Sequence, residues 1–273
     1  MIHYLIVGRT GVGKDYLTEL LRKRGMSVVK SYATRPKRFE TEDSHIFITP
    51  EEAANITDKV ATTTINGYEY FATASQVDAT DIYIIDPKGL QELTANMPDA
   101  AFYLVYVEAD STMTRKTHAV ARAEDKIKEE TVFDQRNEAE DEMFTEFENT
   151  LRHIYQANIP ENIVGIDIFE NTYDKDAAEH FADTIAGHKE FHNMMASIIQ
   201  EGLELGIVSS ADGNPDKIKV VKKDGSENAV SIDRFTEIVS GNPHGMSDFM
   251  KAYIYKSNRF ADLKTNFTES TGE

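Results

Sequence analysis

The stretch that decides the fold spans residues 2–15 and reads Ile2-His3-Tyr4-Leu5-Ile6-Val7-Gly8-Arg9-Thr10-Gly11-Val12-Gly13-Lys14-Asp15. Its apolar half, Tyr4 to Val7, is typical of a buried strand. Gly8, Gly13 and Lys14 then fit the phosphate-binding pattern G-x-x-x-x-G-K. Leucines at helical spacing predict a helix over residues 16–22, whose N-terminus and preceding N–H groups would bind an anion. The order of strand, loop and helix therefore predicts a nucleotide site.

The donor-site candidates are the loop residues Gly8, Arg9, Thr10, Gly11, Val12, Gly13, Lys14 and Asp15. Asp15 stands where the pattern has Ser or Thr, whose hydroxyl would bind Mg²⁺. A carboxylate is a hard oxygen ligand, so Asp15 is the candidate metal ligand, directly or through water. Its charge also weakens nucleotide binding unless a cation offsets it, so its net effect on magnesium stays open.

Composition narrows the class of protein. The chain has 273 residues, 40% of them hydrophobic, which suffices for one large domain or two smaller ones. No apolar run approaches the roughly twenty residues of a membrane span. With no cysteine and no export signal at the N-terminus, we expect a cytoplasmic protein. The net charge of −18 argues against nucleic acid as a partner, because such binders neutralise phosphates.

Strand and helix signals alternate over the first two thirds of the chain. Further strands are predicted at residues 27–31, 81–86, 101–107 and 163–169, with a charged helical stretch at 112–159. Nearly continuous apolar runs are typical of parallel strands covered on both faces, so we expect an α/β fold. Short strand signals around turns between residues 38 and 80 predict a small insertion on this frame.

The last third differs in character. A helix over residues 174–186 would close the first domain, and the character of the sequence changes after Gly187. Helical spacing over 188–205 and a hairpin around Asp224-Gly225 predict a small α+β unit at residues 188–273. Its role stays open, with a homodimer or a protein partner as possibilities.

A basic segment provides the second signal, Ser31-Tyr32-Ala33-Thr34-Arg35-Pro36-Lys37-Arg38. It follows the second predicted strand, at the edge where open α/β sheets bind ligands. Arginine binds phosphate through two parallel hydrogen bonds. In an acidic chain with a phosphate loop, this cluster predicts a second phosphate site.

The phosphate loop followed by Ser31-x-x-x-Arg35-x-x-Arg38 resembles the guanylate kinase family, over about residues 2–186. The resemblance implies a three-layer P-loop kinase fold, with a nucleoside monophosphate-binding insertion at about 36–80 and a helical lid at about 112–140. It also implies ATP and Mg²⁺ as cofactors and GMP or dGMP as the favoured acceptor. The acceptor-site residues that it implies are Ser31, Arg35, Arg38, His45, Tyr70, Thr73 and Asp86.

The roles of these residues follow from the resemblance. His45 stands where the family has its first phosphate-binding tyrosine, and Tyr70 stands where it has the second. Thr73 takes the place of a base-contacting hydroxyl, and Asp86 that of the aspartate that reads the guanine amine edge. A family glutamate that also reads guanine has no counterpart near residues 61–63.

Two further elements complete the implied site. Arg122 and Arg136 fall in the lid and would, with Lys14, be the catalytic residues. Asn171, after the last strand of the sheet, would lie near the adenine of ATP. Two alternatives remain open: a broader deoxynucleoside monophosphate kinase, and a non-catalytic guanylate-kinase-like binding module. The retained Lys14 and acceptor arginines favour an enzyme.

Overall fold

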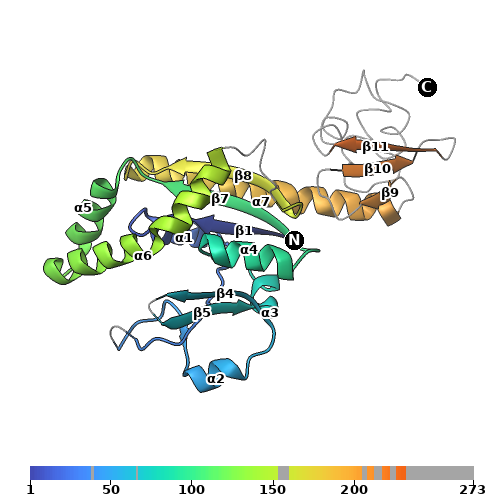
Figure 1. The fold of residues 1–273 in the computed structure, drawn as a ribbon. Helices are drawn as coiled ribbons and strands as arrows, with labels where there is room; N and C mark the ends of the chain where they lie inside the picture. Colours follow the sequence, from blue (N-terminus) through green and yellow to red (C-terminus); the bar gives the residue numbers. More distant parts are fainter. Residues whose placement is uncertain are drawn as a thin grey trace. The chain divides into compact units, whose positions relative to one another are not determined.

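The computed structural model describes residues 1–37, 40–65, 67–152, 160–204, 208–211, 217–221 and 226–231 (Figure 1). Arg38 and the predicted Asp224-Gly225 turn lie outside these residues. The chain divides into two compact units, residues 1–188 and 189–273. All the described candidate site residues belong to the first unit.

A parallel sheet forms the centre of the first unit. Its described strands follow the order β6 (Ile82–Ile84), β1 (Ile2–Val7), β7 (Ala101–Glu108) and β8 (Ile163–Glu170). All three pairings are parallel, which confirms the predicted α/β class. Because the order jumps across the sheet, the C-terminal end of β1 lies between two neighbours, where α/β folds bind ligands.

One predicted strand is wrong. Residues 27–31 contribute only an isolated bridge, from Val28 to Ile82. Backbone pairing with β6 is confined to the residues around this bridge, where the Ile82 N–H donates to the Ser27 carbonyl at 2.9 Å and the Val29 N–H to the Ile82 carbonyl at 2.7 Å. The N–H and the hydroxyl of Ser27 both donate to the carboxylate of Asp81, at 2.8 and 2.7 Å, so this N–H does not extend the ladder.

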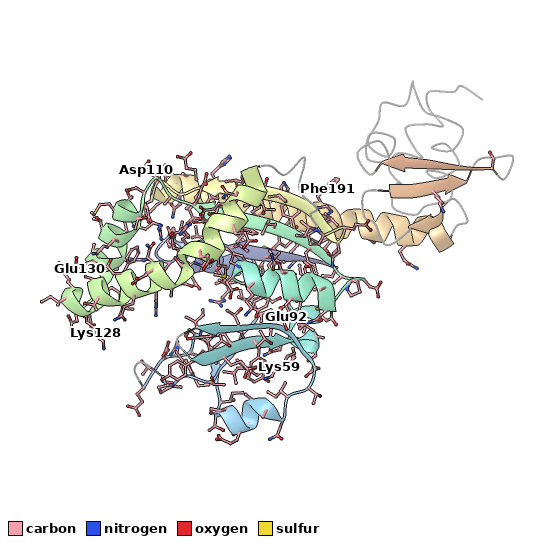
Figure 2. The ribbon with its side chains drawn as sticks, in the orientation of Figure 1. Lys59, Glu92, Asp110, Lys128, Glu130 and Phe191 are labelled. Atoms are coloured by element: carbon pink, nitrogen blue, oxygen red, sulfur yellow. The ribbon has the colours of Figure 1, made fainter. Side chains whose placement is uncertain are left out.

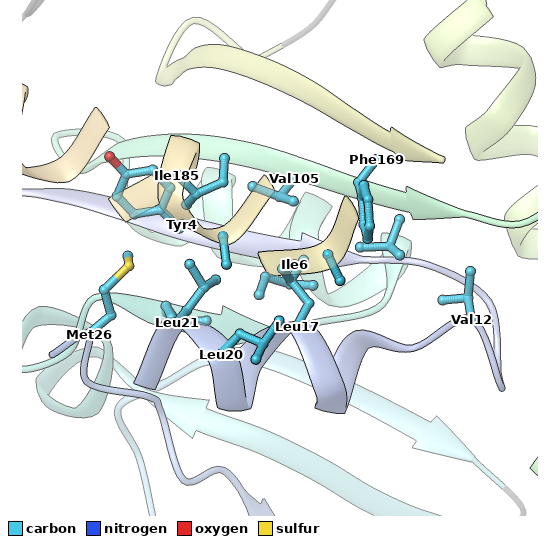
Figure 3. Close-up of a cluster of buried hydrophobic side chains, with 14 residues drawn as sticks. Tyr4, Ile6, Val12, Leu17, Leu20, Leu21, Met26, Val105, Phe169 and Ile185 are labelled. Carbon is cyan, nitrogen blue, oxygen red and sulfur yellow. The ribbon is translucent and has the colours of Figure 1, made fainter. Parts of the chain in front are cut away.

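Helices cover both faces of the sheet. One face packs against α1 (Lys14–Lys23) and α7 (Lys175–Glu204), the other against α4 (Pro87–Asn96) and α6 (Lys126–Arg152). The β1 side chains alternate between these two cores, as a pleated strand requires. Figure 3 shows the first core, where Tyr4 and Ile6 meet Leu17, Leu21 and Ile185. The predicted three layers are therefore present.

A second sheet forms the insertion. Its strands follow the order β3 (Ile46–Phe47), β2 (Tyr32–Ala33), β5 (Tyr68–Thr73) and β4 (Lys59–Ile65), accompanied by α2 (Pro50–Ala54) and α3 (Ala74–Asp78). Strand β4 lies beside α4 of the main frame (Figure 1). Helix α5 (Thr112–Arg122) and α6 then follow β7, which confirms the helical stretch predicted after that strand.

The expected break at Gly187 is absent, because α7 continues through it to Glu204. A single glycine costs a helix interior only about 1 kcal/mol, and the helical spacing on both sides is uninterrupted. The second unit contains β9 (Val208–Ala211), β10 (Lys217–Val221) and β11 (Glu227–Ser231). Antiparallel pairing of β10 and β11 confirms the predicted strand pair. Among the described residues, no helix is both long and apolar enough to cross a membrane.

Candidate functional site

The phosphate loop leaves β1 and turns directly into α1. Gly13, the N-cap of α1, has a φ of 99°, which L side chains rarely adopt. A Cβ at Gly13 would also clash with the Asn171 amide, and one at Gly8 would clash with the Val107 carbonyl. Both glycines are therefore required for the loop to pass this close to its neighbours, as the pattern predicted.

The polar groups of the loop are paired within the chain. The ammonium of Lys14 donates to the carbonyl oxygens of Gly8 (2.5 Å) and Arg9 (3.0 Å). The Thr10 N–H donates to Oε1 of Glu140 on α6, at 2.6 Å. The loop thus already binds one anionic oxygen, which is the chemistry expected of a phosphate site.

Burial shifts the pKa values of Lys14 and Glu140. Desolvation lowers the pKa of Lys14, although the nearby carboxylates of Glu140 and Asp15 oppose the shift. Desolvation also raises the pKa of Glu140, against the opposing effects of the Thr10 hydrogen bond and the Lys14 charge. In both shifts desolvation outweighs the attraction of the nearby opposite charge, so burial is costly for the charged form of each group.

Arg9, a predicted donor-site residue, points away from the loop. Its guanidinium donates to Glu148 through Nε (2.7 Å) and to Asp141 through Nη1 (2.8 Å), both on α6. Tyr106 on β7 also donates to Glu148, at 2.6 Å. Arg9 therefore joins the loop to α6 instead of lining the cavity. The sequence did not single out these acidic partners, because a charged helix normally indicates a solvated face.

Asn171 and Tyr173 fasten the loop from the other side. The buried Asn171 amide donates to the Val12 carbonyl at 2.8 Å, and its Oδ1 accepts from the Tyr173 N–H at 2.8 Å. The Tyr173 hydroxyl donates to the Gly11 carbonyl at 3.0 Å. The ring of His118 stacks on the Tyr173 ring. Asn171 was predicted near the adenine; in the structure its side chain is used in holding the loop.

A cavity of about 590 Å³ adjoins the loop and extends to the insertion. It brings together eight of the predicted residues, namely Gly8, Lys14, Ser31, Arg35, His45, Tyr70, Asp86 and Arg136. Thr63, Tyr83 and Glu140 are among the lining residues that the sequence did not predict. Near the cavity wall, Glu92 on α4 accepts a hydrogen bond from the Thr62 N–H of β4 at 2.6 Å and so ties the insertion to the frame (Figure 2).

The acceptor side of this cavity contains a compact polar group. Ser31 and His45 share a hydrogen bond of 3.0 Å between Oγ and Nδ1, and the His45 ring meets the Tyr70 ring edge-on at 5.5 Å. Arg35 is bound by Glu42 at 2.9 and 2.6 Å. Glu42 was not predicted, although it follows the basic segment by only a few residues.

Arg122, Thr73 and Asp15 do not line the cavity, whereas Asp86 does so and has a second role. Arg122 is exposed, and its Nε donates to the His118 carbonyl one turn earlier in α5, at 3.1 Å. Thr73 caps α3, where its hydroxyl accepts from the Gln76 N–H, because a threonine before a helix satisfies that otherwise unpaired donor. Asp86 lines the cavity and also caps α4 through the Gly89 N–H at 2.9 Å. Asp15 is exposed in the first turn of α1.

Comparisons with known proteins find similarity among solved structures. The chain matches no protein-family model and no curated protein. Among solved structures it is similar to a guanylate kinase from Anaplasma phagocytophilum, with a TM-score of 0.40 and 13% identity over 68% of this chain and 82% of that chain. The chemistry of the site therefore rests on its own residues.

Proposed function

We propose that the chain is an ATP-dependent nucleoside monophosphate kinase, with GMP or dGMP as the favoured acceptor. The observation that supports this proposal is a single cavity lined both by Lys14 of the phosphate loop and by the acceptor residues Ser31 and Arg35. Phosphoryl transfer requires little covalent chemistry from a protein, since positioning and charge neutralisation supply most of the catalysis. A cavity with cations at both ends meets that requirement.

Each residue has a role in this proposal. Lys14 and the loop N–H groups would bind the donor phosphates. Ser31, Arg35 and Tyr70, together with Arg38, would bind the acceptor phosphate. Arg136 lines the cavity and would neutralise charge during transfer, whereas the exposed Arg122 would act only after its segment moves toward the cavity.

Asp15 is the residue of the donor-nucleotide site that would bind magnesium. Bound Mg²⁺ would neutralise charge on the phosphate oxygens. The exposed carboxylate of Asp15 follows Lys14 directly and offers a hard oxygen ligand. We expect Asp15→Asn, which keeps one weaker oxygen ligand, to raise the Mg²⁺ concentration needed for half-maximal activity. Glu19→Gln, an exposed change one turn later in α1, is the matched control; an equal response of both variants would remove Asp15 as a ligand.

The deciding experiment uses Lys14→Ala with Lys23→Ala as the control, because Lys23 is exposed on the same helix. Product formation from ATP and GMP should fall at least about 100-fold in Lys14→Ala, as when one charge-stabilising group is removed from an active site. Lys23→Ala should match the wild type. Absence of any ATP-dependent product from the wild-type protein would favour the binding-module alternative.

Acceptor preference is tested in the same assay. The cavity contains Asp86, which supports guanine, but its other polar side chains near the insertion include hydroxyls, Thr63 and Tyr83, which suit several bases. Rates on GMP, dGMP, dTMP, AMP and CMP should be highest for the two guanine nucleotides. Equal rates on several acceptors would favour the broader deoxynucleoside monophosphate kinase. A homodimer or protein partner through residues 189–273 is a separate proposal, tested by deleting that unit and measuring assembly.

A further inference from the structure

A carboxylate of α6 lies against the phosphate loop. Oε1 of Glu140 accepts from the Thr10 N–H at 2.6 Å and lies 3.8 Å from Nη1 of Arg115. Arg115 is itself buried and donates to the Thr10 carbonyl at 2.8 Å. One residue of the loop is thus contacted on its N–H by the carboxylate and on its carbonyl by the arginine beside it.

The same helix is attached to the loop a second time. Arg9 donates to Asp141 and Glu148, which lie one and eight positions after Glu140 on α6. With Lys14 donating to the Gly8 and Arg9 carbonyls, the principal cations of the loop bind atoms of the chain itself. Among the residues that the structure describes, the Glu140 carboxylate is the one anionic group that contacts a loop N–H.

We propose that Glu140 is an internal competitor of the donor nucleotide, whose carboxylate must leave the Thr10 N–H before a phosphate can use that donor. The proposal rests on the donor site of the proposed function and adds its regulation. Two anions cannot share one N–H, and a hydrogen bond to a charged acceptor is roughly twice as strong as a neutral one. Displacement of Glu140 would also remove one of the contacts between the loop and α6, which carries Arg136, while the Arg9 contacts remain. Donor binding would then be coupled to the position of this part of α6.

The test measures ADP binding by isothermal titration calorimetry on the full chain. Glu140→Ala removes the competitor, Glu140→Gln keeps an acceptor of the same shape without its charge, and Glu138→Gln is an exposed control two positions earlier. Loss of a charged hydrogen bond predicts at least about tenfold tighter ADP binding for Glu140→Ala, a smaller gain for Glu140→Gln and none for the control. The ¹⁵N–¹H resonance of Thr10 should shift in both Glu140 variants before any nucleotide is added.

The outcomes separate the two proposals. Unchanged or weaker ADP binding in folded Glu140→Ala overturns the competitor, and leaves the donor site intact if Lys14→Ala still abolishes binding. Binding that is insensitive to Lys14→Ala means that ADP lies elsewhere and overturns both. Binding by Glu140→Ala where the wild type shows none supports the competitor directly, whereas no binding by any variant overturns both. Thermal unfolding of each variant verifies that it is folded.

Discussion

Glu42 binds Arg35 through both of its carboxylate oxygens, with Nη1 2.9 Å from Oε2 and Nη2 2.6 Å from Oε1. The pair is almost completely buried, with side chains 8% and 4% exposed. Ser44 donates to the same carboxylate at 3.0 Å, and the guanidinium also lies over the Phe47 ring. Both predicted phosphate sites thus contain a carboxylate of the chain itself, Glu42 at the acceptor end and Glu140 at the donor end.

The Arg35–Glu42 pair should be costly to break from one side. Glu42→Ala leaves a buried guanidinium without its partner, so the free energy of unfolding should fall by about 3 kcal/mol. The freed arginine also loses its fixed orientation, which should raise the KM for the acceptor. Urea denaturation and steady-state kinetics measure the two effects. Glu40→Ala, an exposed change two positions earlier, should alter the stability by less than about 0.5 kcal/mol. Equal stability of both variants would mean that the pair contributes nothing to the fold.

The Gly13 position should tolerate no side chain. Gly13→Ala imposes a Cβ on a φ of 99° and also drives it into the Asn171 amide. Gly25 is the matched control, since its φ is 80° and no heavy atom of the described residues lies within 4 Å of the added Cβ. Gly25→Ala should therefore cost only the backbone strain, about 1–2 kcal/mol, and Gly13→Ala distinctly more. Chemical denaturation of both variants measures the difference, and equal costs would show that the Asn171 amide moves aside freely.

The contacts from Asn171 and Tyr173 should keep the loop in shape. Asn171→Ala leaves the buried Val12 carbonyl without its donor, and the free energy of unfolding should fall by about 2 kcal/mol. Tyr173→Phe removes only the hydroxyl on the Gly11 carbonyl and should cost about 1 kcal/mol. Both variants should raise the KM for ATP, Asn171→Ala more than Tyr173→Phe. Tyr16→Phe, on the exposed face of α1, serves as the control and should change neither quantity; the reverse order of the two costs would contradict this assignment.

Much of the fold could be predicted from local sequence patterns. The strand, glycine loop and leucine-faced helix at the start of the chain lie close together in sequence, so periodicity and spacing suffice to predict them. The strand predicted at residues 27–31 was wrong, because the backbone there pairs with β6 only around Val28 and the Ser27 N–H donates to Asp81, more than fifty residues away. Helix α7 continues through Gly187 because the helical spacing on both sides is uninterrupted and a single glycine costs a helix only about 1 kcal/mol.

The candidate site was predictable to a lesser degree. The sequence named Lys14, Ser31 and Arg35, because phosphate chemistry needs those residue types at those spacings. It missed Glu42 and Glu140, since acidic residues in a chain of net charge −18 carry no local signal. The sequence also did not predict that the Asn171 amide would donate to the buried carbonyl of Val12. Such pairings depend on which groups the folded chain brings together.

The raised pKa of Glu140 makes stability depend on pH. Burial raises this pKa above the ordinary value of 4.5, so the folded state binds the proton more tightly than the unfolded chain. The resulting stability is complete below that ordinary value and is lost as the pH rises through the higher pKa of the folded state. Glu140→Gln stays neutral, so its advantage in unfolding free energy over the wild type should grow as urea denaturation is repeated from about pH 4 to about pH 7. The exposed Glu138→Gln should show no such trend. If the unfolding free energy of the wild type instead rises relative to that of Glu140→Gln over this interval, the Thr10 hydrogen bond and the nearby cations outweigh the desolvation of the carboxylate.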